Sequence, residues 1–342
     1  MTNFTDNFTL LRHNTFGLEA TARYWAEFRT TDELREIVRT CLDRHLPWYV
    51  LSGGSNIILT GNFPGVVLHP TGNRISLLEP TLVRAEAGVV WDDLVAWSVE
   101  HGLGGLENLS AIPGLVGAAP VQNIGAYGAE AKDTIETVEY FDTERLETVR
   151  IPGQACAFGY RESIFKGPLR GKAVVTAVEF RLTPERCSSP TGGYTYNIGY
   201  GDLHDRVISL GGPSLANIRR AVIAIREAKL PDPATTGNAG SFFKNPVLPA
   251  RQAEELRSRY PELPGYPSSD GSTVKIPAAW LIDRAGWKGF RSGTVGVHPQ
   301  QALVLINLGG ATAQEILNLA RRIIDDVEQK FGITLSMEVN IL

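Results

Sequence analysis

Two short segments of the chain carry polar side chains that could act on an anionic substrate. In Phe158–Lys166, Arg161 stands among aromatic residues on a short irregular stretch. A guanidinium pairs with a carboxylate through two parallel N–H···O bonds, so this position predicts a carboxylate-binding group. A structural role, in a surface Arg161–Glu162 pair or in bonds to loop carbonyls, fits the same spacing.

The second segment, Gly237–Pro246, presents Ser241 beside two phenylalanines that would anchor it. It is not a G-x-S-x-G nucleophile elbow, and no histidine with an acidic partner stands out as a base for this serine. A polarised hydroxyl can instead give a proton to a substrate. A turn serine bonded to its own backbone is the competing interpretation.

Two further charged residues have positions that fit either chemistry or solvent. Lys229 ends a predicted helix just before the sequence LPDP. It is either a cation for a diphosphate or a solvated charge favoured at a helix C-terminus. Glu338 lies in an apolar terminal segment, where it is either on a solvated face or held for chemistry.

The most unusual segment is Ile112–Gly128, with the sequence IPGLVGAAPVQNIGAYG. Its seventeen residues include four glycines, three alanines, two prolines and no charge. Glycine lets main-chain N–H groups approach a ligand, and a run of such donors forms a concavity that binds anions. The pyrophosphate of a dinucleotide cofactor fits such a site.

A second turn of this kind, Ser52–Asn56 (SGGSN), lies between two apolar segments predicted as strands. It is not the Rossmann fingerprint, because no G-x-G-x-x-G opens a helix after a strand, and it is not a P-loop for nucleoside triphosphates. A plain tight turn would explain it when it is taken alone. Two such segments in one chain favour cofactor binding.

The composition is that of an ordinary globular protein and argues against several partners. The chain has 342 residues, 43% hydrophobic and 20% charged, with a net charge of −4, so we expect two or three domains and no nucleic-acid partner. Cys41, Cys156 and Cys187 form no metal-type pair and suit a reducing cytosol. We expect no metal, no targeting segment and no membrane span, and hence a cytoplasmic protein.

The first half of the chain must supply the elements that position these turns. Its hydrophobic pattern predicts short strands and amphipathic helices, an α+β arrangement. Helices are predicted at 31–45 and 91–101, strands at 48–51, 56–60, 65–69, 82–87 and 173–182, and a hairpin at 134–151.

A long polar segment, Pro184–Gly201, follows and carries Gly192-Gly193 and then Tyr194, Tyr196 and Tyr200. Loops of this length inside compact chains are often binding loops. A surface excursion without function is the alternative.

The second half is predicted as another α+β unit, which begins just before a helix at 213–229. Thr312 and Glu315 form a capping box at the start of its last helix, and Gly332 ends that helix. Helices are predicted near 250–259, 277–285 and 313–330, and strands near 240–247, 293–297, 302–307 and 333–342.

Together these segments resemble the UDP-N-acetylenolpyruvoylglucosamine reductases, flavoenzymes of peptidoglycan precursor synthesis and thus of cell wall biogenesis. The likeness rests on IPGLVGAAPVQNIGAYG, FGYRESIFK, KLPDP, GNAGSFFKNP and the terminal Glu338, in this order and spacing, together with NTFG at Asn14–Gly17 and LSGGSN. It runs from about residue 13 to residue 339. LSGGSN or IPG alone would be shared with other flavoenzymes of the same fold.

The resemblance implies an α+β fold with an FAD-binding domain of the vanillyl-alcohol-oxidase type and a smaller α+β substrate-binding domain. The FAD-binding domain would span 1–211, as subdomains of about 1–68 and 69–211, and the substrate-binding domain would span 212–331. Residues 332–342 would form a C-terminal strand that returns to the FAD domain and the active site.

The resemblance also implies the reaction and its partners. NADPH would reduce a non-covalent FAD and leave, and UDP-N-acetylglucosamine enolpyruvate would then bind in the same cleft and be reduced to UDP-N-acetylmuramate. The flavin N5 would give a hydride to the terminal vinyl carbon. Arg161 and Glu338 would stabilise the resulting negative charge, and Ser241 would protonate the neighbouring carbon. We expect a monomer with no membrane and no nucleic-acid partner.

The family pattern assigns further residues to binding. The cofactor-binding residues would act mainly through backbone donors: Leu51, Ser52, Gly53, Gly54, Ser55, Asn56, Ile112, Pro113, Gly114, Gly117, Ala118, Gln122, Asn123 and Gly125. The substrate-binding residues would be Tyr127, Tyr200, Lys229, Asn245 and Gln301. No metal is implied.

The chain departs from the family pattern in two places. Ala118-Ala119 stand where serines are common, so hydroxyl contacts to the cofactor would be fewer. The loop at 184–200 is longer than expected, and Tyr200 is preferred over Tyr194 and Tyr196 because Gly-Asp-Leu follows it. Two other functions stay open: another FAD-dependent oxidoreductase of the same fold, or a non-enzymatic nucleotide-sugar-binding protein.

Overall fold

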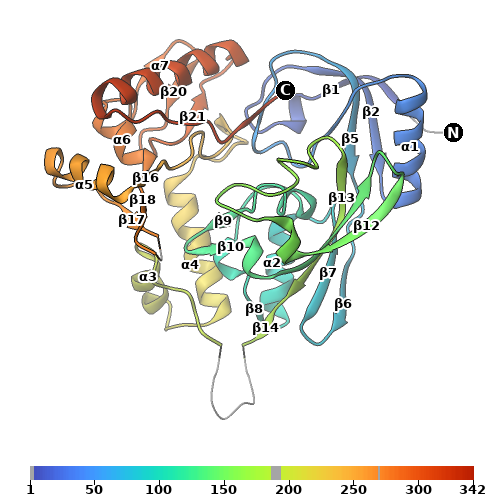
Figure 1. Ribbon diagram of the computed structural model, residues 1–342, viewed down its shortest axis with the longest axis horizontal. Helices are drawn as coiled ribbons and strands as arrows, with labels where there is room; N and C mark the ends of the chain where they lie inside the picture. The colour runs from blue at the N-terminus through green and yellow to red at the C-terminus, as the bar shows by residue number, and fades with distance from the viewer. Residues whose placement is uncertain (1–3, 186–193, 269) are drawn as a thin grey trace. The chain divides into compact units, whose positions relative to one another are not determined.

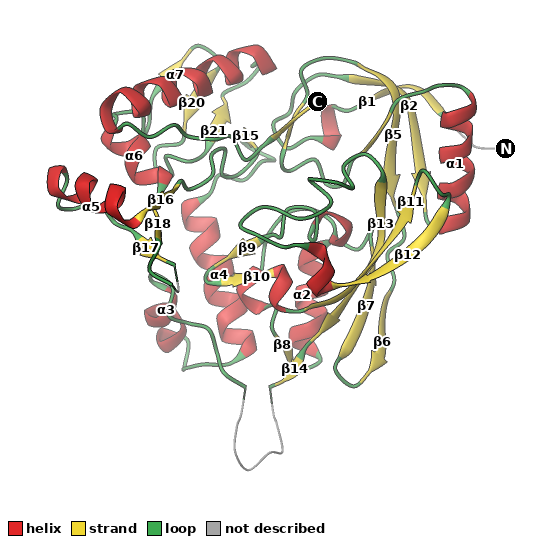
Figure 2. Ribbon diagram, in the orientation of Figure 1, coloured by secondary structure: helices red, strands yellow, loops and turns green. Residues whose placement is uncertain are grey.

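The computed structural model describes residues 4–185, 194–268 and 270–342 (Figures 1 and 2). The chain forms two compact units. Unit 1 comprises Met1–Phe8, Ala22–Gly53 and Phe63–Ala228, and unit 2 comprises Thr9–Thr21, Gly54–Asn62 and Lys229–Leu342.

The first sheet of unit 1 has the strand order β1-β2-β5-β3. Its strands are β1 (Thr5–Thr9), β2 (Thr21–Phe28), β5 (Phe63–Pro70) and β3 (Trp48–Val50), with β5 parallel to both β2 and β3. Helix α1 (Thr31–Asp43) begins at a capping box between Thr30 and Glu33 and buries Leu34, Ile37, Val38 and Cys41 in the same core as this sheet. The sheet ends at β3, directly before the first glycine turn.

The second sheet of unit 1 is antiparallel and has the order β12-β11-β13-β7-β6. Its strands are β6 (Ile75–Glu79), β7 (Leu82–Glu86), β11 (Ile135–Asp142), β12 (Glu147–Pro152) and β13 (Ala173–Arg181). Helix α2 (Trp91–Glu100) buries Trp91, Leu94 and Val95 in the core of this sheet. The predicted hairpin at 134–151 is confirmed as β11 and β12.

Shorter elements connect the sheets of unit 1. The short strands are β8 (Leu103–Gly104), β9 (Gly125–Ala126), β10 (Ala129–Glu130) and β14 (Thr183–Pro184). The 3₁₀ helices are η2 (Glu107–Leu109), η3 (Val116–Ala118), η4 (Ala131–Asp133) and η5 (Gly153–Cys156). Of the predicted loop 184–201, residues 186–193, with Cys187 and Gly192-Gly193, lie outside the described residues.

Helix α4 (Leu215–Lys229) confirms the predicted helix, but its residues up to Ala228 belong to unit 1. The expected boundary between residues 211 and 212 therefore does not coincide with the boundary of the compact units. One apolar face of α4 packs with α3 (Leu203–Ser209) in a small core, and its Arg219 forms a two-bond ion pair with Asp92 of α2. These contacts attach the helix to unit 1.

Unit 2 contains two small sheets, a strand pair, three α-helices and one 3₁₀ helix among its described residues. The sheets have the orders β15-β21-β20-β19 and β16-β18-β17, and β22 pairs with β4 in parallel. The strands are β4 (Ile57–Ile58), β15 (Gly237–Asn238), β16 (Val247–Pro249), β17 (Tyr266–Pro267), β18 (Thr273–Lys275), β19 (Arg291–Ser292), β20 (Val295–Val297), β21 (Leu305–Asn307) and β22 (Asn340–Ile341). The helices are α5 (Ala250–Arg259), α6 (Ala278–Arg284), α7 (Ala313–Phe331) and the 3₁₀ helix η1 (Leu11–His13).

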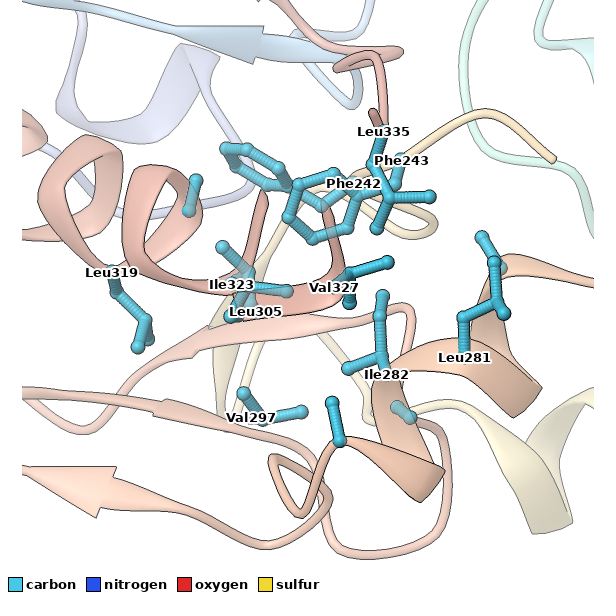
Figure 3. Packing of buried hydrophobic residues seen from close by; sticks show 14 of the residues in the cluster. Phe242, Phe243, Leu281, Ile282, Val297, Leu305, Leu319, Ile323, Val327 and Leu335 are labelled. Atoms are coloured by element: carbon cyan, nitrogen blue, oxygen red, sulfur yellow. The ribbon is translucent and has the colours of Figure 1, made fainter. Parts of the chain in front are cut away.

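Helix α7 shows the predicted ends. Thr312 and Glu315 form the capping box, and Gly332 ends the helix with φ of 71° in the left-handed region. The core of unit 2 lies under this helix, where Ile323 and Val327 pack with Phe242 and Phe243 (Figure 3).

Two predicted strands of unit 2 are wrong. Most of 240–247 is an irregular stretch, with an isolated bridge between Phe243 and Met337 and a strand only from Val247. Most of 333–342 is also irregular, and only Asn340–Ile341 form a strand. Residues 333–339 alternate between buried and more exposed side chains, and an extended irregular segment along the core can share this pattern with a strand. In 240–247 the consecutive Phe242 and Phe243 are both buried.

Candidate active site

The two glycine turns predicted to bind a cofactor meet in unit 1. The Ser52 hydroxyl accepts a hydrogen bond from the Leu115 N–H at 3.1 Å. A Cβ built on Gly53 would lie 3.0 Å from the Gly114 Cα, and Gly114 itself has φ of 123°. The two backbones therefore touch at a place where neither residue can carry a side chain without strain or a shift.

The core of unit 1 holds the second turn in place. Val116, Ala119 and Ile124 are buried in the core beneath the antiparallel sheet. The carbonyl of Gly114 accepts a hydrogen bond from the first N–H of α2, at Trp91, at 3.0 Å. The turn is therefore held to the core of unit 1 at several points.

Two of the predicted cofactor glycines have a packing reason for being glycine. A Cβ on Gly117 would lie 2.8 Å from the Cβ of Ala87, and a Cβ on Gly54 would lie 1.9 Å from the His13 carbonyl oxygen. Gly54 also has φ of 63°. The small size of these two residues is explained without a ligand.

Arg161 lies against the end of the same turn. Its Nη2 donates to the carbonyl of Gly125 at 2.9 Å, and a Cβ on Gly125 would lie 3.3 Å from Arg161 Nη1. Arg161 has φ of 57°, and the Lys166 ammonium donates to its carbonyl at 3.1 Å. The structural interpretation, an arginine bonded to a loop carbonyl, is thus part of the geometry, and it places the guanidinium at the predicted cofactor turn.

Asn123 ties the Arg161 segment to this turn. Its Nδ2 donates to the Gly159 carbonyl at 3.0 Å and to Glu130 Oε2 at 3.1 Å, while its Oδ1 accepts from the Lys132 N–H at 3.0 Å. The side chain is fully buried. Asn123 therefore holds the turn and the Arg161 segment together, and its predicted contact with a cofactor stays a prediction.

Tyr127 is bonded to a cation that the sequence analysis did not single out, Arg226 of α4. Burial raises the pKa of the Tyr127 phenol, and the charge and hydrogen bond of Arg226 lower it in part. Burial also lowers the pKa of Arg226, against the opposing effects of Tyr127 and Asp92. Arg226 stands three residues before Lys229 in a helix, and this spacing was the available signal, since residues three apart lie on one helix face.

Asp92 links three segments around this cation. It accepts from both Nη atoms of Arg219, at 2.6 and 2.8 Å, and from the Ala111 N–H at 2.6 Å. Burial alone would raise the pKa of Asp92, but the hydrogen bonds from Arg219 and Ala111 outweigh it and lower that pKa. The ion pair therefore connects α2 and α4 to the entry of the glycine-rich turn.

The three tyrosines of the long loop have different surroundings. The Tyr194 and Tyr196 hydroxyls donate to the carboxylates of Glu107, at 2.6 Å, and Glu185, at 3.0 Å. Tyr200 instead meets the ring of Tyr127 edge to face, with 6.0 Å between the ring centroids. The preference for Tyr200 as the substrate-facing tyrosine stays a prediction.

Ser241 and Glu338 lie on paired segments of unit 2. The Glu338 N–H donates to the Phe242 carbonyl at 2.8 Å, and the Lys244 N–H donates to the Ser336 carbonyl at 2.9 Å. Gly240, just before the serine, has φ of 66°. Both Ser241 and Glu338 are half-buried, and the hydrogen bond from Glu338 to Phe242 places the predicted proton donor and the predicted acid on adjoining segments.

The structure also shows where the other predicted site residues of unit 2 lie. Asn245 Oδ1 accepts from the first N–H of α6, at Ala278, at 2.9 Å. Gln301 begins a turn whose Leu303 carbonyl accepts from the Phe242 N–H at 2.8 Å. Asn56 Nδ2 approaches the Glu338 carbonyl at 3.4 Å. Lys229 is exposed at the end of α4.

The turns of unit 1 fit a dinucleotide cofactor. Gly53 exposes bare main chain where a Cβ would lie 3.0 Å from the Gly114 Cα, and Gly114 has φ of 123°. The turn from Ile112 to Gly125 carries no charge. Such a surface can follow a pyrophosphate and a flat ring system closely. The residues that would hold FAD here are Leu51–Gly53 and Ile112–Gly125.

Within 4–185, 194–268 and 270–342, no helix combines the length and apolar character that a membrane span requires. Over the same ranges, no three His, Cys, Asp or Glu side chains are grouped so as to hold a metal ion.

Comparisons with known proteins identify the class of the chain and then its family. A family model described as "FAD binding domain" matches residues 22–149, and the model "UDP-N-acetylenolpyruvoylglucosamine reductase, C-terminal domain" matches residues 232–342. The chain is therefore an FAD-binding oxidoreductase, and the predicted α+β fold with an FAD-binding domain is confirmed.

Curated relatives match nearly the whole chain. UDP-N-acetylenolpyruvoylglucosamine reductase of Pseudomonas aeruginosa is 46% identical over 339 residues, which cover 97% of both chains. The Flavobacterium johnsoniae protein of the same name is 41% identical over 342 residues, covering 98% of both. The chain belongs to the UDP-N-acetylenolpyruvoylglucosamine reductase family.

A solved structure agrees in fold. UDP-N-acetylenolpyruvylglucosamine reductase from Thermus caldophilus matches with a TM-score of 0.70 and 23% identity, over 100% of this chain and 99% of that one.

Proposed function

We propose that this chain reduces the enolpyruvyl double bond of UDP-N-acetylglucosamine enolpyruvate to give UDP-N-acetylmuramate, with FAD as a non-covalent cofactor and NADPH as the reductant. Family membership supports the reaction. The observation that carries the proposal is the bond from Arg161 Nη2 to the Gly125 carbonyl, 2.9 Å long. It joins a carboxylate-binding side chain to the turn that fits the cofactor.

Bound FAD supplies the hydride that reaches the terminal vinyl carbon. Hydride addition there leaves negative charge on the carbon that carries the substrate carboxylate. The Arg161 guanidinium, fixed by Gly125 and by its own turn, stabilises this charge most where it develops most, in the transition state.

Ser241 then gives its hydroxyl proton to that carbon. A serine is a weak acid and must be polarised by a neighbour. Glu338 lies on the segment paired with Ser241, and in its protonated form it would share in stabilising the charge that Arg161 faces. The rigid segment around Phe242 keeps the hydroxyl in one position.

The UDP end of the substrate is assigned to aromatic and cationic groups. Tyr127 and Tyr200, with Arg226 bonded to Tyr127, are proposed to contact the diphosphate, together with Lys229. Asn245 and Gln301 are proposed to bind the rest of the substrate.

The domain limits, the oligomeric state and the cellular location are also part of the proposal. The FAD-binding part is assigned to residues 1–211, the substrate-binding part to 212–331, and residues 332–342 return Glu338 to the site. The protein is proposed to act as a cytoplasmic monomer in peptidoglycan precursor synthesis, with no membrane and no nucleic-acid partner.

An anaerobic two-step experiment tests the function. The purified flavoprotein is reduced with NADPH, and candidate acceptors are then added while the flavin absorbance near 450 nm is followed. Reoxidation by the enolpyruvyl UDP-sugar, and not by UDP-N-acetylglucosamine, is expected. Reoxidation by simple sugars or alcohols, or flavin that stays with acid-precipitated protein, would instead indicate another flavin oxidoreductase.

A further inference from the structure

Two adjacent buried residues of unit 1 face the end of the long loop. Glu107 and Asn108 stand in η2 with 1% and 2% of their surfaces exposed. We call residues 194–200 the returning arm. Glu107 Oε1 accepts from the Tyr194 hydroxyl at 2.6 Å, while its Oε2 accepts from the Gly105 N–H at 2.7 Å. A buried carboxylate of this kind is satisfied only while both donors stay in place.

Asn108 links the returning arm to the Tyr127 turn. Its Nδ2 donates to the carbonyl of Tyr127 at 2.8 Å and to the carbonyl of Asn197 at 2.7 Å. Asn197 Nδ2 in turn donates to the Gly128 carbonyl at 2.8 Å. The Asn108 side-chain amide therefore uses both of its hydrogens to join the Tyr127 turn to the returning arm.

This link matters because of what lies at its two ends. Tyr127 has φ of 48°, a conformation that a bulky residue rarely adopts and that neighbouring contacts must hold. Tyr200, at the end of the returning arm, meets the Tyr127 ring edge to face. A change at Asn108 would release the backbone on both sides of this aromatic pair.

We propose that Glu107 and Asn108 are positioning residues that fix the returning arm against the Tyr127 turn and so hold Tyr200 beside Tyr127. The proposal rests on the proposed function, in which this pair contacts the diphosphate of the UDP-sugar. Tyr194 is then an anchor whose hydroxyl points to protein, and Tyr200 is the tyrosine that contacts the substrate. Preorganisation of this kind lowers the entropy cost of binding.

The test compares Asn108→Ala with Thr143→Val in the FAD-loaded enzyme. Thr143 is also buried in unit 1, and its hydroxyl also donates to a carbonyl, that of Lys172 at 3.0 Å, but it belongs to the turn after β11. For Asn108→Ala we expect a rise of about tenfold in KM for the enolpyruvyl UDP-sugar, from two lost hydrogen bonds. The limiting rate of flavin reduction at saturating NADPH stays within about twofold, and Thr143→Val changes neither quantity.

A double-mutant cycle with Tyr200→Ala separates positioning from general damage. If Asn108 acts through the returning arm, adding Asn108→Ala to Tyr200→Ala costs much less than about tenfold in kcat/KM. Full additivity, or an unchanged KM in the single variant, would overturn the proposal. A wild-type protein that the sugar does not reoxidise would overturn the proposed function itself, and the inference with it.

Hydrogen exchange gives a readout that does not depend on activity. Amides of 194–203 should exchange faster in Asn108→Ala and in Tyr194→Phe than in Thr143→Val, because each of the first two removes an anchor of the arm. Tyr194→Phe also serves if Asn108→Ala fails to fold. Equal exchange of this segment in Tyr194→Phe and Thr143→Val would contradict the anchoring role.

Discussion

The two units hold their proposed reactive side chains by different means. Arg161 of unit 1 sits on a left-handed turn, with φ of 57°, and is fixed by hydrogen bonds to Gly125 and from Lys166. Ser241 of unit 2 sits beside Phe242 and Phe243, which are buried in an apolar core. One position depends on a few directional polar bonds, and the other depends on packing.

This difference agrees with the roles proposed for the Arg161 guanidinium and the Ser241 hydroxyl. A guanidinium must be aimed, because its fork pairs with a carboxylate only in a narrow geometry. A hydroxyl can rotate to find its partner and mainly needs a fixed Cα. Polar mutations should therefore damage the Arg161 turn, whereas cavity-forming mutations should damage the Ser241 segment.

The largest expected effect tests the proton donor itself. For Ser241→Ala we expect reoxidation of the flavin by the UDP-sugar to slow by about 10³-fold, within the range of general acid catalysis. Flavin reduction by NADPH stays nearly unchanged, since that half-reaction needs no proton from Ser241. Anaerobic stopped-flow measurement of the two half-reactions checks this, and equal losses in both would rule out the assigned role.

The next largest effect tests whether packing holds Ser241. Phe242→Ala should lower the free energy of unfolding by about 3–5 kcal/mol, because a fully buried aromatic ring is lost from the core. Reoxidation by the UDP-sugar should also slow, since the serine beside the new cavity loses its fixed position. Chemical denaturation and the reoxidation rate are measured on the same variant.

Phe331→Ala is the matched control for this packing test. Phe331 belongs to the same core but lies at the end of α7. It should destabilise the protein to a similar degree and leave the reoxidation rate of the folded enzyme unchanged. Similar rate losses in both variants would mean that general stability, and not the local packing at Phe242, positions the serine.

A smaller loss of reoxidation rate is expected when the planar guanidinium of Arg161 is replaced by an ammonium group of the same charge. Arg161→Lys should lower the rate of reoxidation by the UDP-sugar by about 10²-fold, comparable to the loss of one fixed donor in a transition state. Stability should change by less than in Phe242→Ala. Arg150→Lys, which alters an ion pair with Glu179 on the antiparallel sheet, is the control and should keep the wild-type rate.

Several local features of both units could be predicted from the sequence. Strong local signals were read correctly: the capping box at Thr312, the end of α7 at Gly332 and the hairpin 134–151. The glycine-rich turns were expected to lie together, and Ser52 and Leu115 confirm that they do. Regular spacing and unusual composition are properties that a single segment carries by itself.

Features that depend on distant partners could not be predicted. Residues 240–247 and 333–342 were predicted as strands but are mostly irregular, because their buried side chains follow the core of unit 2. The helical pattern of α4 is visible in the sequence, but the Asp92–Arg219 pair that attaches it to unit 1 joins residues far apart in the chain. Gly117 and Gly54 are small because Ala87 and His13 lie against them.

The smallest expected effect concerns the ion pair that attaches α4 to unit 1, and it depends on pH. Asp92→Asn should cost about 1–2 kcal/mol of stability at neutral pH, because Arg219 and Ala111 lose a charged acceptor. The folded-state pKa of Asp92 is lowered from its usual value of 3.8. Its stabilisation is thus fully present above that value and is lost as the pH falls through the folded pKa.

Denaturation of wild type and Asp92→Asn across the acid range checks the sign of this effect. The difference between the two proteins should be constant from neutral pH down to about pH 5, then shrink as the pH falls further. Asp92→Asn should slow reoxidation by the UDP-sugar less than Arg161→Lys does. Asp92 is proposed to act on the site indirectly, through its contacts with Ala111 and with the arginines of α4. A difference that grew on acidification would mean that burial, rather than Arg219, controls the charge of Asp92. The Asp92–Arg219 ion pair would then not stabilise unit 1, and the contrast between a unit held by polar bonds and a unit held by packing would fail.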